Sequence, residues 1–311
     1  MSETTPSARL LLATAVAPMA WGTTYAVTTE LLPSGRPLWA ATVRALPAGL
    51  VLVAVTRRRP SGAAWWRLTV LGTLNVGGFF ALLFVAADRL PGGVAATLGA
   101  VQPLLAAGLA ALLLGEAIHR RTLVAGALGI IGVALLVLRA DAALDGWGVA
   151  AGLLATTSMA TGVVLTKRWG RSLPLLAATG WQLVAGGVVL VPVMLVLEGT
   201  PSTLTAGNLT GHLWLGLVGT ALAYSLWFRG VESLPVQRVS LLGLCSPLVA
   251  TTVGWLVLGQ SLSLGQLAGA AAVLAALRIG QSRPAADGAH RLVTVRAMAL
   301  IPGRAATPPP A

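Results

Sequence analysis

Aromatic and polar side chains recur at helical spacing inside long apolar stretches of this sequence. Trp21, Thr24, Tyr25 and Thr28 are spaced i, i+3, i+4 and i+7, which places them on one face of a helix. Such a polar and aromatic face is typical of a small-molecule site near the middle of a membrane. The residues that we predict to bind a small-molecule substrate are Trp21, Thr24, Tyr25, Arg44, Asn75, Phe79, Gln102, Ser158, Trp181, Gln182, Tyr224 and Ser246.

These side chains also have a structural interpretation. Ser and Thr hydroxyls inside helices bond carbonyl groups of their own helix, and aromatic rings pack against neighbouring helices. The amides of Asn75, Gln102 and Gln182 are the stronger binding candidates. A buried amide needs hydrogen-bond partners from elsewhere in the fold or from a ligand.

Signatures of catalysis are missing from the sequence. His119, His212 and His290 are far apart and fall in loops, at helix ends or in the tail. No metal-binding or nucleophile motif accompanies them. The one cysteine, Cys245, has no partner for an internal disulfide. We therefore predict no enzyme activity, no metal and no cofactor.

The chain of 311 residues is 56% hydrophobic and only 10% charged, with a mean hydropathy of +0.83. Soluble domains carry about 25% charged residues, so this composition excludes a soluble globule and a disordered chain. The formal net charge of +12 does not indicate nucleic-acid binding, because the arginines lie between apolar runs. The expected partner is instead the lipid bilayer.

Ten apolar runs are long enough to cross a bilayer, and few contain an interior charge. The predicted spans are residues 10–28, 38–55, 68–87, 92–114, 123–138, 148–165, 175–197, 213–231, 235–258 and 264–277. Residues 1–9 form a cytoplasmic N-terminus, and residues 281–311 form a disordered basic cytoplasmic tail. The fold predicted from this pattern is an all-α integral membrane protein.

The arginines also set the predicted orientation. With the N-terminus inside, 17 of the 21 Lys and Arg residues lie on the cytoplasmic side and only Arg36, Arg89 and Arg139 lie outside. This bias predicts that both termini are cytoplasmic. Lys167 is the only lysine, and this arginine excess with the Ala and Gly richness indicates a GC-rich bacterial genome. We expect a multi-pass protein of the bacterial cytoplasmic membrane.

The two halves of the chain resemble each other. Shifting residues 90–116 by 144 positions onto 234–260 makes ten of 27 positions identical, including Pro91 and Pro103. We assign 10–140 and 146–280 to two repeats of five helices each. Because five is odd, the second repeat enters the membrane inverted, which is the architecture of alternating access.

The duplicated unit and several short motifs resemble a known family. The motifs are Trp21-Gly22, Leu-Leu-Leu-Gly-Glu at 112–116, Trp181-Gln182, and the prolines Pro103 and Pro247 in the fourth and ninth spans. On these residues the chain is similar to an EamA-domain transporter of the drug/metabolite transporter superfamily. The resemblance covers about residues 10–280 and implies ten helices, with both termini inside. It also implies export of amino acids or related metabolites. Gln260 departs from the pattern, since its repeat counterpart is Glu116.

Arg44 is the charge that lies deepest inside a predicted span, and two interpretations stay open for it. Its long side chain can reach the outer surface or pair with helix-end carbonyls. Alternatively it faces the cavity and holds a substrate carboxylate with its planar fork of donors. Its repeat counterpart is Trp181, so the second interpretation predicts a charged side and an aromatic side.

Prolines and glycines of the spans also have two interpretations each. Pro103 and Pro247 are either hinges or static kinks. Gly265 and Gly269 form a Gly-x-x-x-Gly motif that favours close packing of helices within the monomer, with a homodimer through this face as the alternative.

We predict a secondary transporter that exports small metabolites, most simply amino acids or close relatives, by alternating access. The alternative is a proton-coupled drug or cation efflux pump. Such pumps use an intramembrane carboxylate, whereas Glu30, Asp88, Glu116, Glu198 and Glu232 all fall at helix ends or in loops. A third class, a helical bundle without transport function, would not need the inverted repeat.

Overall fold

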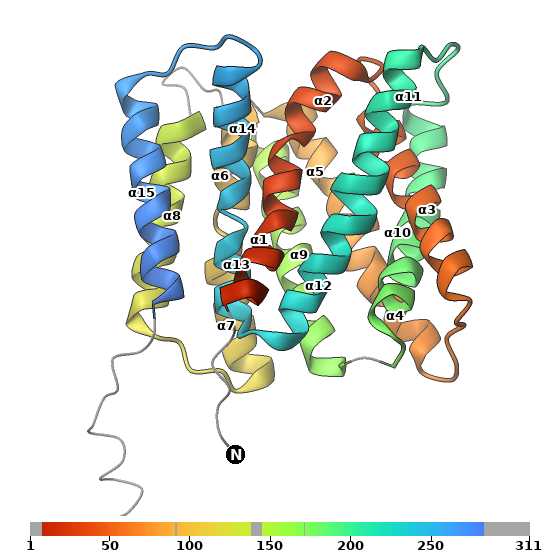
Figure 1. Ribbon diagram of the computed structural model, residues 1–311, viewed down its shortest axis with the longest axis horizontal. Coiled ribbons are helices and arrows are strands. Elements are labelled where there is room, and N and C mark those ends of the chain that lie inside the picture. Colours follow the sequence, from red (N-terminus) through yellow and green to blue (C-terminus); the bar gives the residue numbers. More distant parts are fainter. Residues whose placement is uncertain (1–7, 91, 138–144, 171, 283–311) are drawn as a thin grey trace, which may run out of the picture. The chain divides into compact units, whose positions relative to one another are not determined.

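A computed structural model describes residues 8–90, 92–137, 145–170 and 172–282 of the chain (Figure 1). Within these ranges the secondary structure is entirely helical. The first half contains α1 (Ala8–Gly22), α2 (Thr24–Leu31), α3 (Pro37–Thr56), α4 (Ala64–Gly72), η1 (Thr73–Gly77), α5 (Gly78–Arg89), α6 (Gly92–Gly99), α7 (Gln102–Leu114) and α8 (Arg120–Val137). The second half contains α9 (Gly146–Trp169), α10 (Leu175–Leu197), α11 (Ala206–Leu213), η2 (Trp214–Leu222), α12 (Ala223–Ser233), α13 (Val236–Leu242), α14 (Cys245–Leu256) and α15 (Leu264–Gln281).

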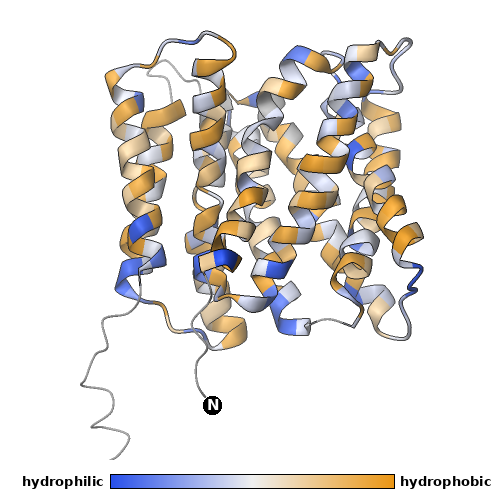
Figure 2. Ribbon diagram, in the orientation of Figure 1, coloured by the Kyte–Doolittle hydropathy of each residue, from blue (hydrophilic) through white to orange (hydrophobic). Residues whose placement is uncertain are grey.

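Nine helical segments in the described part of the chain are long and apolar enough to cross a membrane, and α1 is a shorter apolar helix. The predicted all-α membrane fold is thus confirmed. Figure 2 shows hydrophilic residues concentrated near the ends of the helices and in the connections. Large apolar side chains face outward, as at Leu50, Val55 and Val196, which are 52%, 72% and 82% exposed. This surface suits lipid rather than water. Of the predicted tail, residues 283–311 lie outside the described part.

The fourth and ninth spans are each broken into two helices. In the fourth, α6 ends at Gly99 and α7 begins at Gln102, and in the ninth α13 ends at Leu242 and α14 begins at Cys245. The two breaks correspond under the shift of 144 positions found in the sequence. Pro103 and Pro247 therefore lie in the first turn of a helix, where the missing proline N–H costs nothing.

The third and eighth spans each contain a π-helical segment. η1 and η2 overlap under the same shift, so the two segments are related by the repeat. Sequence periodicity did not predict them. A π-turn holds one residue more than an α-turn, and such segments often occur at functional sites.

Two pairs of repeat-related helices pack directly against each other. In α3 and α10, a Cβ added at Gly49 would lie 2.7 Å from the Val184 nitrogen, so the backbones approach as closely as glycine allows. In α8 and α15, a Cβ on Gly269 would lie 2.7 Å from the Gly132 oxygen. Gly269 is thus engaged within the monomer, whereas nothing but Ser263 approaches a Cβ at Gly265 within 4 Å.

The N-terminal end of α3 is fixed by a carboxylate from another part of the chain. The Glu198 Oε1 and Oε2 atoms accept hydrogen bonds from the backbone nitrogens of Leu38 and Trp39 at 2.7 and 2.8 Å. These are two of the unpaired N–H groups that begin any helix, and an anion there is favoured by the helix dipole. Glu198 directly follows α10, so it joins the ends of α3 and α10.

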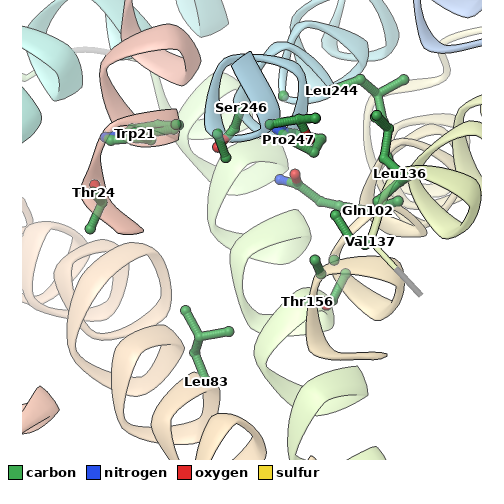
Figure 3. A pocket seen from close by; sticks show the side chains of 18 of the residues that line it. Trp21, Thr24, Leu83, Gln102, Leu136, Val137, Thr156, Leu244, Ser246 and Pro247 are labelled. Carbon is green, nitrogen blue, oxygen red and sulfur yellow. The ribbon is translucent and has the colours of Figure 1, made fainter. Parts of the chain in front are cut away.

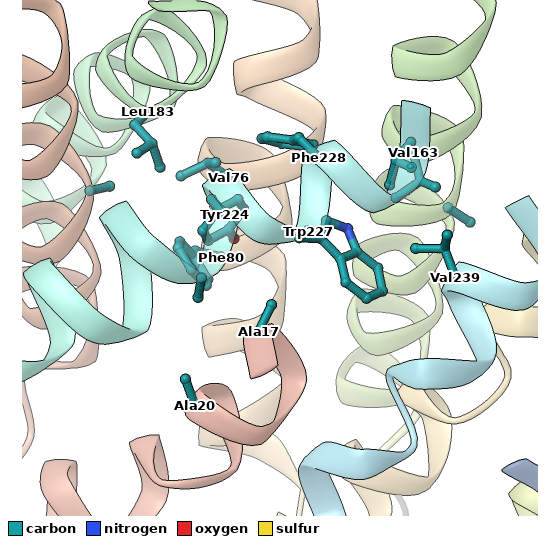
Figure 4. Close-up of a cluster of buried hydrophobic side chains, with 14 of the residues drawn as sticks. Ala17, Ala20, Val76, Phe80, Val163, Leu183, Tyr224, Trp227, Phe228 and Val239 are labelled. Atoms are coloured by element: carbon teal, nitrogen blue, oxygen red, sulfur yellow. The ribbon is translucent and has the colours of Figure 1, made fainter. Parts of the chain in front are cut away.

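The largest hydrophobic cluster lies where the two halves meet. It contains Tyr224, Trp227 and Phe228 of α12, which are at most 2% exposed, with Val163 of α9 and Val239 of α13 (Figure 4). The side chains that Figure 4 labels come from six helices and from the η1 segment. This cluster holds the segments that carry the predicted binding residues.

Candidate functional site

A cavity of about 1040 Å³ lies between the two halves of the bundle (Figure 3). Seven of the predicted site residues contribute to its wall: Trp21, Thr24, Arg44, Phe79, Gln102, Tyr224 and Ser246. Pro103 and Pro247 also line it, as do Phe80, Thr156, Trp227 and Ser240. The volume is ample for a small metabolite.

The cavity reaches the face of the bundle where α14 connects to α15. Gln260, Ser261 and Ser263 of this connection line it, together with the end of α8 at Leu135–Val137. Toward the opposite face, the space is filled by the cluster around Trp227 and Phe228. The cavity is thus open on one side of the bundle and closed on the other.

Arg44 lies in the wall of this cavity and is only 6% exposed. Its Nε donates to Thr220 Oγ1 at 3.0 Å and its Nη2 donates to the Gly219 carbonyl at 2.8 Å. The guanidinium also lies over the Phe80 ring, 5.2 Å from the ring centre. Neither ion pair found in the described residues involves Arg44. The side chain thus turns into the protein and bonds a carbonyl there, while its charge has no carboxylate partner.

The π-helical segment η2 supplies the acceptors for Arg44. The Gly219 carbonyl also accepts a hydrogen bond from Trp21 Nε1 at 2.9 Å. In the first half, the corresponding carbonyl is that of Asn75 in η1, which accepts from the Tyr224 hydroxyl at 3.3 Å. Each π segment thus presents one carbonyl to side chains of other helices, and these two carbonyls are repeat-related.

An aromatic wall adjoins Arg44. The Trp21 ring lies 5.2 Å from the Tyr224 ring and 5.3 Å from the Trp227 ring, both in tilted contact. Tyr224 and Trp227 come from α12, and Trp21, which was also predicted, comes from α1. The Tyr25 side chain lies outside the described part of the structure.

Asn75, Gln182 and Ser158 do not line the cavity but form a polar cluster behind it. Asn75 Nδ2 donates to Gln182 Oε1 at 3.1 Å and approaches Thr166 Oγ1 at 3.4 Å. Ser158 donates to the Leu74 carbonyl at 2.9 Å. These bonds engage the Asn75 amide nitrogen, the Gln182 amide oxygen and the Ser158 hydroxyl inside the fold and hold the η1 segment, whereas Asn75 Oδ1 is buried without a partner. Their position favours the structural interpretation of these three residues.

Trp181 lies at the closed face, away from Arg44. Its Nε1 donates to the Arg58 carbonyl at 2.9 Å, and its ring meets Trp65 edge-on at 4.9 Å. The aromatic side of the site is formed instead by Trp21, Tyr224 and Trp227. Thr220, Trp227 and Ser240 were not among the predicted site residues. The i, i+4, i+7 spacing of Thr220, Tyr224 and Trp227 was the available signal.

An ion pair joins helix ends at the closed face. Lys167 Nζ lies 3.1 Å from Glu116 Oε1 and donates to the Leu234 carbonyl at 2.6 Å. Beside it, Gln237 Nε2 donates to the Ala117 carbonyl at 2.8 Å. These contacts join α9, the α7–α8 connection and the start of α13. The repeat counterpart of Glu116 is Gln260, which lies at the open face and lines the cavity.

Inverted repeats around a central cavity, with apolar outer surfaces, define a multi-pass membrane protein of the transporter class. A family model described as the EamA-like transporter family matches residues 8–138 and 146–279. The chain belongs to this family, and the resemblance noted in the sequence is confirmed.

Two relatives match this chain over most of its length or about two thirds of it. Protein PecM of Dickeya dadantii is 48% identical over 85% of this chain and 90% of its own length. A probable amino-acid metabolite efflux pump of Salmonella typhimurium is 31% identical over 65% of this chain and 72% of its own. One crystal structure matches with a TM-score of 0.77 over 89% of this chain and 97% of that chain, at 18% identity, which shows a shared fold.

Proposed function

We propose that this protein exports small carboxylate-bearing metabolites, namely amino acids or close relatives, by alternating access. The observation that carries the proposal is the cavity, whose lining in the described part of the chain contains one charged side chain, the buried Arg44, and no carboxylate. A buried, unpaired arginine in a binding cavity favours an anionic group of the ligand. The name of the Salmonella relative, an amino-acid metabolite efflux pump, supports the same class and direction.

The distribution of charge supports an assignment of the two faces. The closed face carries Arg57–Arg59, Lys167 and Arg168, and both α1 and α8 begin there, whereas the open face carries Arg36 and Arg89 (Figure 1). Since positive residues favour the cytoplasmic side, the closed face is assigned to the cytoplasm. The structure then corresponds to an outward-open state.

This assignment predicts the pattern of cysteine labelling in whole cells. In a Cys245→Ser background, Ser61→Cys and Ala117→Cys place thiols at exposed positions of the closed face, and Ser202→Cys places one at the open face. A membrane-impermeant maleimide is expected to label only Ser202→Cys until the cells are made permeable. Labelling of Ser61→Cys or Ala117→Cys in intact cells would contradict the topology.

A screen of expressing cells tests the function itself. Cells that overproduce the protein are challenged with toxic amino-acid analogues and, in parallel, with cationic dyes. We expect resistance to analogues that carry a carboxylate, lost in the Arg44→Leu variant. Resistance to dyes alone overturns the proposal in favour of the alternative drug or cation pump.

A further inference from the structure

Several buried polar atoms of the cavity wall have no hydrogen-bond partner. They are Thr24 Oγ1, Gln102 Nε2, Trp227 Nε1 and Ser240 Oγ. Trp227 and Ser240 are 1% and 0% exposed. An indole N–H is a donor only, and a primary amide nitrogen donates two hydrogens. Leaving such donors buried and unpaired is costly in a folded protein, so they need a partner that the chain does not supply.

Two of these atoms belong to the segments around the two helix breaks. Gln102 begins α7 after the break of the fourth span, and Ser240 lies on α13 just before the break of the ninth. The Gln102 side chain extends to that second break, since its Oε1 would lie 3.7 Å from a Cβ on Gly243. Trp227 of α12 lines the same cavity. The helices α7 and α14 also begin at these breaks, and the N-terminus of a helix favours hydrogen-bond acceptor atoms.

This group of donors is separate from Arg44, but the side chain of Trp21 connects the two. Trp21 shares the Gly219 carbonyl with Arg44 and contacts the ring of Trp227. A ligand with its carboxylate on Arg44 therefore lies along the Trp21 ring before it meets the Trp227 indole N–H. The apolar part of the ligand then contacts the aromatic wall.

The described lining contains no Asp or Glu, and the Trp227 indole can only donate. An ammonium group at the second position would therefore meet the indole donor and no carboxylate. A carbonyl or amide oxygen, by contrast, can accept from the indole N–H and from the Ser240 hydroxyl or the Gln102 amide nitrogen. The wall therefore favours a ligand whose second polar group is an uncharged hydrogen-bond acceptor rather than an ammonium group.

We infer that Trp227, Ser240 and Gln102 form a second subsite, which binds an uncharged carbonyl or amide oxygen of a carboxylate substrate. The inference rests on the proposed function and narrows it. Within amino-acid relatives, it selects compounds in which the amino nitrogen is acylated or replaced by a carbonyl, in preference to free zwitterions.

Three matched probes test the subsite by equilibrium binding to the full-length protein in lipid nanodiscs. The probe 3-phenylpropionate offers a carboxylate and a ring, N-acetylphenylalanine adds an amide oxygen, and phenylalanine adds an ammonium group instead. N-acetylphenylalanine is expected to bind about three- to tenfold more tightly than 3-phenylpropionate, the effect of about one hydrogen bond. Phenylalanine is expected to bind more weakly than both.

Two variants locate the effect. Trp227→Phe keeps the ring and removes the N–H, and Ser240→Ala removes the hydroxyl. Each is expected to weaken binding of N-acetylphenylalanine more than binding of 3-phenylpropionate, because only the former has an oxygen that accepts from the N–H or the hydroxyl. Trp147→Phe is the matched control, because Trp147 is 76% exposed and outside the cavity lining. Folding is checked by monodisperse elution of each variant.

The outcomes separate the subsite from the proposed function. If binding requires Arg44 but the preference survives both variants, the subsite is wrong and the function stands. Tighter binding of phenylalanine than of N-acetylphenylalanine also overturns the subsite. Equal losses for all probes in Trp227→Phe indicate a packing role instead. If the parent protein binds none of the three probes, both the subsite and the proposed carboxylate class fail.

Discussion

Replacing Arg44 with leucine is expected to lower export of a carboxylate substrate about 10- to 100-fold, the effect of losing a charge-assisted hydrogen bond of about 1.5–3 kcal/mol. Arg44 Nε donates a hydrogen bond to the Thr220 hydroxyl, and Nη2 donates one to the Gly219 carbonyl. The Nη1 group is left for a ligand. Export is measured as efflux of a labelled analogue from expressing cells.

Arg44→Lys distinguishes charge from geometry. Lysine keeps the positive charge but cannot bind a carboxylate with two parallel donors, so we expect partial rescue. Both variants should reach the membrane in normal amounts, because Thr220 keeps its own bond to the Leu215 carbonyl at 2.7 Å and Gly219 keeps Trp21. Parental export by Arg44→Leu would refute the carboxylate role. Failure of both variants to accumulate would instead make Arg44 structural.

Breaking the pair between Glu116 and Lys167 is expected to open the closed face. Glu116→Gln removes the ion pair and weakens the hold on Lys167, whose side chain is only 26% exposed. A partly buried pair of this kind contributes roughly 1–2 kcal/mol, which changes an equilibrium between closed and open states about five- to thirtyfold. Because Lys167 is the only lysine, amine-reactive reagents report directly on this site once the N-terminal amine is counted separately.

The measurement is the rate of modification of Lys167 in inside-out vesicles, read by mass spectrometry. Glu116→Gln should raise this rate several-fold. The double variant Glu116→Lys with Lys167→Glu exchanges the two charges and should keep the face closed. A cysteine placed in the cavity of this double variant should therefore react slowly with reagents that enter from that face. Arg89→Gln is the control, since the pair of Arg89 with Asp145 is 3.8 Å long, exposed and on the open face. An unchanged rate in Glu116→Gln would show that the pair does not hold this face closed.

The sequence predicted the spans and the repeat well, because both can be recognised from the hydropathy and the order of the residues along the chain. Lipid demands about 20 apolar residues per crossing, so hydropathy alone places the helices. The breaks before Pro103 and Pro247 also carried a signal, as proline favours the first turn of a helix. What hydropathy does not fix is the direction in which a given residue points around its helix.

The third span shows this limit most clearly. Asn75 and Phe79 are four residues apart, and helical periodicity placed both on the binding face. The structure puts Phe79 in the cavity wall and Asn75 in the cluster behind it. The η1 segment ends at Gly77, between the two. One extra residue in a turn rotates everything beyond it by about 100°, so the regular period does not apply across it.

The packing of α3 on α10 and of α8 on α15 has a consequence for movement. A contact between two helices that the repeat exchanges lies on the twofold axis that relates the halves. When the halves exchange conformations in the proposed cycle, each of these contacts is retained. Contacts away from the axis, such as that of Glu116 with Lys167, are broken and replaced by the equivalent contacts of the other half. The glycine contacts of Gly49 with α10 and of Gly132 with Gly269 are therefore expected to persist through the proposed cycle.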